Sequence, residues 1–565
     1  MGIPAFFSLV VRKYKNIVRP LNNLQGTNHN LYLDCNSIVY DCVKELEFTG
    51  NTKAYEKQIS LNVCRKVTDY ISHVKPTETV CIAFDGVAPC AKLEQQRSRR
   101  YRSWFTTKII GDTKDKWNTM AITPGTSFMN MLGATVSTYF KNPKKFGVNE
   151  ILVSDSNEAG EGEHKIFSYI RNNPDKHANQ RTIVYGLDAD LIMLTLNHIP
   201  YCDSIYLYRE TPHFIRSLNR QLEPNTLYVL DIPNLSNGLA SELISNVPPA
   251  SNKSIAGIVG DYVFMCFLLG NDFMPHMPSL NLRTTGMQRL IKCYRKVQMN
   301  GDSLVSENKI KWNSVRRLIA LLANKERKYF INEMELRGTL EKKNMPPREG
   351  DNIKEHELNC IPIYNRAKER YIEPREDYWE WRYYKVLFDI DTSTQVGKSE
   401  LKRICLNYLE ALEWTHKYYT NACPDWRWTY NYHYAPLMAD VLKFIPALDT
   451  ELLEQQNDDN NSNNSNNSSA STRYTPLKPM VQLSYVLPKA GLSLLPKTLE
   501  RRILETIGEC YSENWEFEWS FCRYFWEAHP KMTQISIDKL EKVIYQYMRR
   551  QTHQEINGQN QKVIK

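Results

Sequence analysis

Seven acidic residues in the first half of the chain follow apolar, strand-like runs. NLYLD ends at Asp34, VCIAFD at Asp85 and FLLGND at Asp272; TIVYGLDAD supplies Asp188 and Asp190, and EILVSDS leads into Glu161 and Glu163. In an open α/β sheet, side chains at the carboxyl ends of the strands meet in one crevice. Seven carboxylates there repel one another unless cations neutralise them, and oxygen ligands without a nearby histidine or cysteine favour Mg2+ or Mn2+ over zinc. The pattern predicts a metal-dependent enzyme that acts on phosphate groups.

The spacing of these acids suits a pair of metal ions. Asp188 and Asp190 are two residues apart and face the same way if the strand stays extended, whereas Glu161 and Glu163 would diverge by about 200° on a regular helix. The glycines on either side of Glu161 are expected to open the turn there. Two ions about 3.5–4 Å apart can activate a water and stabilise the leaving oxygen during phosphodiester cleavage. Any one of these acids alone is more often a cap or a surface carboxylate, so the prediction depends on the group.

A basic helix is predicted between Pro89 and Lys108, a few residues after Asp85. At about 100° per residue, one face carries cations and an amide, while Leu93, Tyr101, Trp104 and Phe105 share another face. The first set comprises Lys92, Gln96, Arg99 and Arg100. On an isolated helix such a face is more often simply solvated. Its place beside the acid group favours a phosphate-binding role instead.

Charge and cysteine content narrow the class of protein. The chain has 565 residues and a formal net charge of +9, so with an acidic site set aside the remaining surface is basic and suits a polyanionic partner. Thirteen cysteines without a C-x-x-C pair argue against a zinc module or a disulfide framework. The longest apolar run, Val263 to Leu269, is too short to span a membrane. The N-terminus lacks the order of a signal peptide, so we expect an intracellular protein, in the cytoplasm rather than the nucleus, although the nucleus stays open.

The order of predicted elements indicates an α/β fold, with a mostly parallel central sheet wrapped by helices and a helical, aromatic-rich C-terminal part. The predicted strands are 30–34, 79–84, 150–154, 181–187, 204–209 and 226–231. We divide the chain into a nuclease-like core (1–295), a helical and aromatic-rich region (296–454), an Asn/Ser-rich loop expected to be disordered (455–472), and a return segment with C-terminal helices (473–565). The return segment, PLKPMVQLSYVLPKAGLSLLP, reads as packed extended chain. The pattern after 497 is helical, with Trp515, Trp519 and Trp526 as core candidates.

Aromatic residues gather between 379 and 434. Trp426 and Trp428 lead one group, and bases stack on such rings without regard to sequence. Most of these rings are nevertheless expected to lie in the core.

The sequence resembles the XRN-type 5′→3′ exoribonucleases, which are related to flap endonucleases and PIN-like nucleases. The resemblance runs from residue 1 to about 495, with the family's motifs in order. They are MGIPAFF, NLYLDCNSIVYDC, AFDGVAPCAKLEQQRSRRYRS, GEGEHKI, YGLDADLIML, DYVFMCFLLGNDFMPHMPS, PIYNRAKERY, YNYHYAPLMADV and PLKPMVQLSYVLP.

The resemblance implies a PIN-like nuclease core and assigns roles to the residues grouped above. The seven acids are expected to be catalytic and to hold two divalent ions, and Lys92, Gln96, Arg99 and Arg100 to bind a 5′-monophosphate. Tyr40 occupies the family's stacking position, and the aromatic group described above makes Trp426 and Trp428 candidates to stack on bases as well. The implied activity is processive Mg2+-dependent degradation of single-stranded RNA from a 5′-monophosphate end, with release of nucleoside 5′-monophosphates and a role in RNA decay. Protein partners are not implied.

Three departures from the family pattern bear on these expectations. Tyr40 stands where the family commonly has a histidine, so stacking is retained but a cationic role is not. Ala159 precedes GEGEHK where proline is expected. The sequence ends at 565 without the long C-terminal extension of cytoplasmic members, so the helices after 497 are expected to brace the core instead.

Two other functions stay open. A structure-specific DNA or RNA endonuclease would share the metal chemistry, but FMPHMPSLNLRTTG follows Asp272 where duplex-binding relatives carry a glycine-rich helix-hairpin-helix. A non-catalytic RNA-binding scaffold would have no need of all seven acids.

Overall fold

The computed structural model describes most of the chain. The described residues are 6–111, 116–210, 220, 222–223, 226–244, 254–299, 301–306, 309–342, 350–360, 366–454 and 473–563. The predicted disordered loop at 455–472 lies outside them. No helix among the described residues is long and apolar enough to cross a membrane, and the twelve cysteines whose side chains the structure describes are free thiols.

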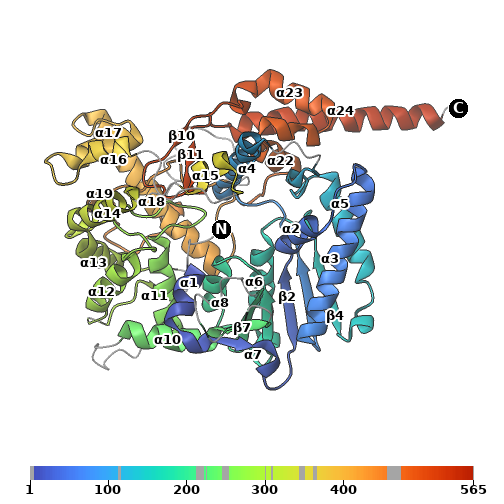
Figure 1. Ribbon diagram of the computed structural model, residues 1–565, viewed down its shortest axis with the longest axis horizontal. Coiled ribbons are helices and arrows are strands. Elements are labelled where there is room, and N and C mark those ends of the chain that lie inside the picture. The colour runs from blue at the N-terminus through green and yellow to red at the C-terminus, as the bar shows by residue number, and fades with distance from the viewer. Residues whose placement is uncertain are drawn as a thin grey trace.

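A seven-stranded sheet forms the centre of the N-terminal part (Figure 1). Its strands are β1 (Val18–Pro20), β2 (Asn30–Asp34), β3 (Thr79–Ala83), β4 (Glu150–Ser154), β5 (Thr182–Tyr185), β6 (Ile205–Arg209) and β7 (Tyr228–Asp231). The order is β1-β7-β6-β5-β2-β3-β4, and the five strands from β6 to β4 are parallel to one another. β7 pairs antiparallel with β6, and β1 pairs antiparallel with β7. The predicted mostly parallel sheet and its six strands are confirmed. Only the three-residue edge strand β1 was missed in this sheet, because so short a run has no readable alternation.

Helices cover both faces of the sheet, as βαβ crossovers require. Tyr32 and Val184 face one hydrophobic cluster, and Leu31, Leu33 and Ile183 face the other, so side chains alternate along each strand. The first cluster contains α1 (Phe6–Lys13), α6 (Gly162–Asn172), α8 (Asp190–Asn197), α10 (Ile232–Ile244) and α11 (Ile255–Phe267), with α7 (Pro174–Ala178) nearby. The second contains α2 (Asn36–Glu45), α3 (Thr52–Val74) and α5 (Ser127–Tyr139).

The middle of the chain is helical, as expected from its pattern. It comprises α12 (Gly286–Gln298), α13 (Trp312–Ala323), α14 (Glu326–Glu341), α15 (Ile353–Cys360), α16 (Ala367–Ile372), α17 (Trp379–Phe388), α18 (Gln395–Thr420) and α19 (Met438–Phe444), with a small hairpin of β8 (Val305–Ser306) and β9 (Lys309–Ile310). Trp379, Tyr383 and Tyr384 are buried together, so these rings belong to the core.

The C-terminal part corrects two expectations. The return segment is not extended: Pro479 begins helix α22 (Pro479–Val486), followed by the 3-10 turn η5 (Lys489–Leu494). After α23 (Lys497–Ile507) the chain forms a small hairpin of β10 (Phe517–Glu518) and β11 (His529–Pro530) before α24 (Ile537–Val563), so the region is not continuously helical. Trp515 and Trp519 are half-buried and Trp526 is 36% exposed, because they lie on this hairpin rather than inside a helical core.

Helix α4 (Cys90–Ile110) connects these parts (Figure 1). Its apolar Leu93 packs with α22, α23 and α24. Arg97 donates to the carbonyls of Cys510 and Thr533, and Tyr101 donates to the carbonyl of Glu513. The C-terminal segment therefore braces α4, the helix that carries the predicted phosphate-binding residues.

Candidate active site

Parallel strands place four of the predicted acids along one edge of the sheet. Asp34 is the last residue of β2, and Asp85 lies two residues beyond β3. Asp188 lies three residues beyond β5, and Asp190 begins α8. Because β2, β3 and β5 are parallel and adjacent, their carboxyl ends bring these side chains to the same place.

The turn after β4 brings in two more acids. Glu161 precedes α6 and Glu163 lies in its first turn. Gly160 has φ of 103°, a conformation that glycine adopts without strain, as expected of an opened turn. The first residue of α6, Gly162, donates its backbone N–H to Asp85 Oδ1 at 2.8 Å.

The run before Asp272 is not a strand, contrary to the prediction. Residues 255–267 form α11, and Asp272 lies in the loop that follows it. The run Val263 to Leu269 is apolar because this part of the helix is buried on all sides, and such a run cannot be distinguished from a buried strand by periodicity. The loop still brings Asp272 to the acid group, where Lys92 pairs with it.

A cavity of about 310 Å3, here called the acid cavity, joins most of the predicted site. Its lining includes five of the seven acids, three of the four predicted phosphate-binding residues and the predicted stacking residue: Asp34, Asp85, Glu161, Glu163 and Asp188; Gln96, Arg99 and Arg100; and Tyr40. Asp190 and Asp272 do not line it; they lie behind it, 3% and 8% exposed.

Burial and mutual repulsion raise the pKa of several of these acids. For Asp34 the causes are burial and the charges of Asp85, Asp188 and Glu161. For Glu163 they are burial and the charge of Glu161. Burial and Asp272 raise the pKa of Asp190 to about 7. Raised pKa values with these causes are typical of carboxylates whose charge a bound cation would stabilise.

The carboxylates fit a divalent ion. Three buried oxygens, Asp34 Oδ1, Glu163 Oε2 and Asp190 Oδ1, have no hydrogen-bond partner among the described residues. Unpaired carboxylate oxygens are the ligands that Mg2+ and Mn2+ prefer, and leaving them unpaired in the protein interior is costly.

A histidine also lies within reach, which the sequence analysis did not expect. Glu161, Glu163 and His164 each offer a ligand atom within 4.8 Å of the others. The His164 ring stacks on Tyr418 with 3.7 Å between centroids, and burial, with Lys92 nearby, lowers the pKa of His164, so its imidazole is neutral. It was missed because it follows Glu163 directly in GEGEHKI, and the strand-end argument considered acids alone.

Lys92 lies inside the acid group and does not line the acid cavity. Its Nζ is 2.6 Å from Glu161 Oε1 and 2.9 Å from Asp272 Oδ2, and it is 7% exposed. Burial opposes its charge, but Asp272 and Glu161 outweigh burial and raise the pKa of Lys92. Burial would likewise raise the pKa of Asp272, yet Lys92 holds it below the usual range. Lys92 thus links two predicted metal ligands.

The other predicted phosphate-binding residues face the acid cavity with unused donors. Arg100 donates to the Met120 carbonyl only at 3.5 Å, and its Nε has no partner among the described residues. Burial, with the charge of Arg99 added, lowers the pKa of Arg100 to about 10. Arg99 is exposed at the same cavity. Unpaired guanidinium groups beside the carboxylates form the binding surface that a phosphate requires.

The predicted stacking residues differ in exposure. Tyr40 lines the acid cavity and is 38% exposed, so its ring is accessible for stacking, and its stacking role stays a prediction. Trp428 is 7% exposed, stacks on Trp414 at 5.4 Å and donates to Glu410, so it is a core residue and not a base-stacking surface. Trp426 is half-buried near the start of α4, where its carbonyl accepts the N–H of Cys90, and its stacking role stays a prediction.

Three residues that support the acids were not found from the sequence. Asn36 donates to Asp85 and accepts its backbone N–H, Tyr418 donates to Glu161 at 3.0 Å, and Gln95 donates to Asp272 at 2.9 Å. None carries a charge or stands in a repeated spacing, so only the fold reveals them.

Comparison with known proteins agrees with the motif pattern. Residues 1–211 match the family model described as XRN 5′-3′ exonuclease N-terminus, and 252–370 and 371–456 match that described as Xrn1 helical domain. A 5′-3′ exoribonuclease 2 of Debaryomyces hansenii is 25% identical over 96% of this chain and 69% of its own length. A 5′-3′ exoribonuclease 2 homolog of Drosophila melanogaster is 26% identical over 98% and 72%.

A third relative, the 5′-3′ exoribonuclease 1 of Schizosaccharomyces pombe, is 25% identical over 94% of this chain but only 47% of its own length. The two family models together cover most of the chain from residue 1 to 456, including all seven acids and the four residues of α4. The chain belongs to the XRN family of 5′-3′ exonucleases.

Proposed function

We propose that the protein is a Mg2+-dependent 5′→3′ exoribonuclease that degrades single-stranded RNA from a 5′-monophosphate end and releases nucleoside 5′-monophosphates processively. The names of its relatives support exoribonuclease activity. The preference for a 5′-monophosphate and the use of Mg2+ are proposed from the acid cavity. In this cavity of about 310 Å3, carboxylates and unpaired guanidinium groups line the same space. A scissile phosphate and a terminal phosphate can be bound there together.

Residues of α4 bind the 5′ end. Arg99 and Arg100 supply charged donors, and Gln96 adds an amide, so a terminal phosphate gains charge-assisted hydrogen bonds that a 5′-hydroxyl cannot make. The cavity is near the lower limit of small-molecule sites, which span roughly 300–1,000 Å3. It has little room for a triphosphate or a cap, and the entrance beside Tyr40 suits an unpaired strand whose base stacks on the ring.

The carboxylates of Asp34, Asp85, Glu161, Glu163 and Asp188 would hold the divalent ions, with Asp190 and Asp272 behind them. When bound, two ions activate a water and stabilise the leaving oxygen of a phosphodiester. Asn36 and Tyr418 keep Asp85 and Glu161 oriented through hydrogen bonds. Each cleavage exposes a new 5′-phosphate, which the same arginines can bind, and this favours processive degradation.

The test uses purified protein with Mg2+ and 3′-labelled single-stranded RNAs that end in 5′-monophosphate, 5′-hydroxyl or 5′-triphosphate. Only the monophosphate RNA should disappear, without intermediates. Asp188→Asn should abolish cleavage and retain RNA binding. Asp203→Asn should behave as wild type, because Asp203 is an exposed acid at the amino end of β6, whereas the acid group lies at the carboxyl ends of the parallel strands.

Arg99→Ala tests the phosphate-binding role separately. Loss of one charge-assisted hydrogen bond of about 1.5–3 kcal/mol should lower kcat/KM for the monophosphate RNA roughly 10- to 150-fold. The exposed Arg65 on α3 supplies the control Arg65→Ala.

In the assay with three RNAs, equal cleavage of all three would indicate an endonuclease, and tight binding without cleavage would indicate an RNA-binding scaffold.

A further inference from the structure

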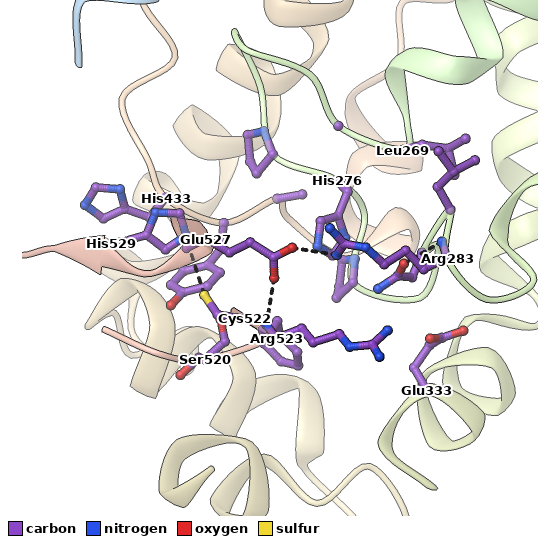
Figure 2. Close-up of a pocket in the computed structure, with 18 of the residues that line it drawn as sticks. Leu269, His276, Arg283, Glu333, His433, Ser520, Cys522, Arg523, Glu527 and His529 are labelled. Carbon is purple, nitrogen blue, oxygen red and sulfur yellow. Dashed lines mark hydrogen bonds and ion pairs between the residues drawn. The ribbon is translucent and has the colours of Figure 1, made fainter. Parts of the chain in front are cut away.

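A second cavity lies against a neighbouring face of α4. It has a volume of about 530 Å3 and is here called the Arg102 cavity. Its walls come from α4 (Gln95 and Arg102), the loop 269–284, α14, residues 433–435 and the C-terminal hairpin 520–529 (Figure 2). On the helix, Gln95 and Arg102 share one direction and Gln96 and Arg100 point about 100–160° away. Arg99, which lines the acid cavity, lies between them at about 40–60°, so the two cavities adjoin along α4.

The acids of the Arg102 cavity are already neutralised. Arg283 lies 2.5 Å from Glu527, and Figure 2 shows this pair inside the cavity. Glu333 pairs with Arg289 at 2.9 Å. The third acid, Asp272, pairs with Lys92. No lining carboxylate therefore lacks a basic partner.

Two arginines of the same lining have no carboxylate partner among the described residues. Arg102 is 8% exposed and donates to the carbonyl of Ala528 at 2.6 Å. Arg523 has a buried Nε without a hydrogen-bond partner, and its side chain extends into the space between Glu527 and Glu333 in Figure 2. Arg523 is half-buried, and its guanidinium lies over the Tyr524 ring at 5.1 Å. Two guanidinium groups without a carboxylate partner, facing a partly enclosed cavity, favour an anionic ligand.

The rim offers a stacking surface beside these cations. Trp526 lines the cavity and is 36% exposed, and its ring is parallel to that of Tyr524, with 5.8 Å between centroids and 11° between planes. Arg283 lies over both rings. An aromatic platform next to unpaired guanidinium groups suits a ligand that combines a base with a phosphate.

The Arg102 cavity reaches the acid group through a thin wall. Asp272 and Gln95 line it, and Gln95 donates to Asp272 at 2.9 Å. On the other side of that contact, Lys92 joins Asp272 to Glu161, which lines the acid cavity. The linked side chains of Gln95, Asp272, Lys92 and Glu161 therefore lie between the two cavities.

We propose that the Arg102 cavity binds a nucleoside 5′-monophosphate, with its phosphate on Arg102 and Arg523 and its base on Trp526, and that the reaction product leaves by this route. The proposal rests on the proposed function, because the remaining RNA occupies the acid cavity while each product departs. Its volume lies within the roughly 300–1,000 Å3 typical of small-molecule sites, so a mononucleotide fits.

Equilibrium dialysis of the full chain with radiolabelled AMP tests the binding site without requiring catalysis. Wild-type protein should bind two AMP molecules, and Arg99→Ala should retain the site in the Arg102 cavity. Arg523→Gln should weaken that site roughly 10- to 100-fold, the effect of losing a charge-assisted hydrogen bond. Arg102→Gln is a second variant, and the exposed Arg501 supplies the control Arg501→Gln.

A single AMP site that is lost in Arg99→Ala and unchanged in Arg523→Gln would overturn the proposal and leave the proposed function intact. Absence of any AMP binding at millimolar concentration, in protein that still cleaves RNA, would overturn it as well. Two sites in protein without exonuclease activity would support the nucleotide site and contradict the proposed function.

The exit role has its own test at the cavity mouth. Leu336 lines the cavity and is 43% exposed, so Leu336→Trp should narrow the opening while Leu336→Ala should not. On 5′-monophosphate RNA, the tryptophan variant should slow steady-state nucleotide release at least fivefold and leave the first cleavage unchanged. Equal slowing of both steps, or of neither, would contradict release through this cavity.

Discussion

The contact between Gly162 and Asp34 makes a single methyl group a sensitive probe of the acid group. In Gly162→Ala the new Cβ would lie 2.7 Å from Asp34 Oδ1, 3.2 Å from the Ala83 carbonyl oxygen and 3.5 Å from Asp85 Oδ1. Carbon and oxygen ordinarily approach no closer than about 3.3 Å. The Asp34 carboxylate or the start of α6 must therefore move by roughly 0.6 Å.

The expected effects on stability and on catalysis differ in size. Alanine favours a helix by about 0.5–1 kcal/mol over glycine, whereas overpacking costs about 1–3 kcal/mol, so the net loss of unfolding free energy should stay below about 2.5 kcal/mol. A misplacement of about 1 Å can cost about 100-fold in rate, so a shift of roughly 0.6 Å predicts a kcat about 10- to 100-fold lower.

Single-turnover cleavage of 5′-monophosphate RNA at saturating Mg2+, together with thermal unfolding, separates the two effects. Gly508→Ala is the matched control, because no atom lies within 4 Å of its Cβ position and its φ is −58°. A folded Gly162→Ala protein that cleaves within about twofold of wild type would refute the claim that this close contact positions Asp34.

Three further predictions concern charge and hydrogen bonding. The metal-free protein should lose stability as pH rises from 3.8 to about 7, because over that range the raised pKa of Asp190 lets the folded state keep a proton that the unfolded chain has already released. Mg2+ at about 100 times its Kd should restore about 2.7 kcal/mol, and Asp190→Asn should flatten the pH profile of Tm. Tyr418→Phe removes the 3.0 Å hydrogen bond to Glu161 and should lower unfolding free energy by about 1.5–3 kcal/mol in urea titrations, with Tyr371→Phe, an exposed ring, unchanged. Glu541→Gln breaks a bidentate pair with Arg427, both bonds 3.0 Å, and should cost about 1 kcal/mol by the same titration without changing the rate of cleavage; a loss of rate instead would show that this pair also positions the site.

The sequence predicted the parallel part of the site well for a physical reason. β2, β3 and β5 are buried on both faces, so they read as short apolar runs, and an acid directly after such a run must lie at the sheet edge. Asp34, Asp85 and Asp188 follow that rule. Helix α4 was also predictable, since its cations and its apolar residues separate at helical spacing.

The rest depended on contacts between distant segments. Asp272 was found, although through a supposed strand that is the buried end of α11. The ion pairs of Lys92 with Glu161 and Asp272 could not be predicted, because a lysine between two carboxylates looks identical in sequence to one that faces a phosphate. The phosphate-binding role of Lys92 stays a prediction. Trp428 was assigned to base stacking from its neighbours, but its burial depends on Trp414 in α18.

The position of α4 explains how the C-terminal segment can influence the chemistry without touching it. Arg97, Tyr101 and Arg102 donate to backbone carbonyls between residues 510 and 533, more than 400 positions along the chain. These bonds fix the rotation and position of α4, and on a rigid helix that rotation also sets where Arg99 and Arg100 lie relative to the acids. The proposed selection of the 5′ end by Arg99 and Arg100 is thus tied to the hairpin that closes the Arg102 cavity against a neighbouring part of α4. Loosening the hairpin should disturb both cavities together, whereas a change confined to Arg99 should disturb only one.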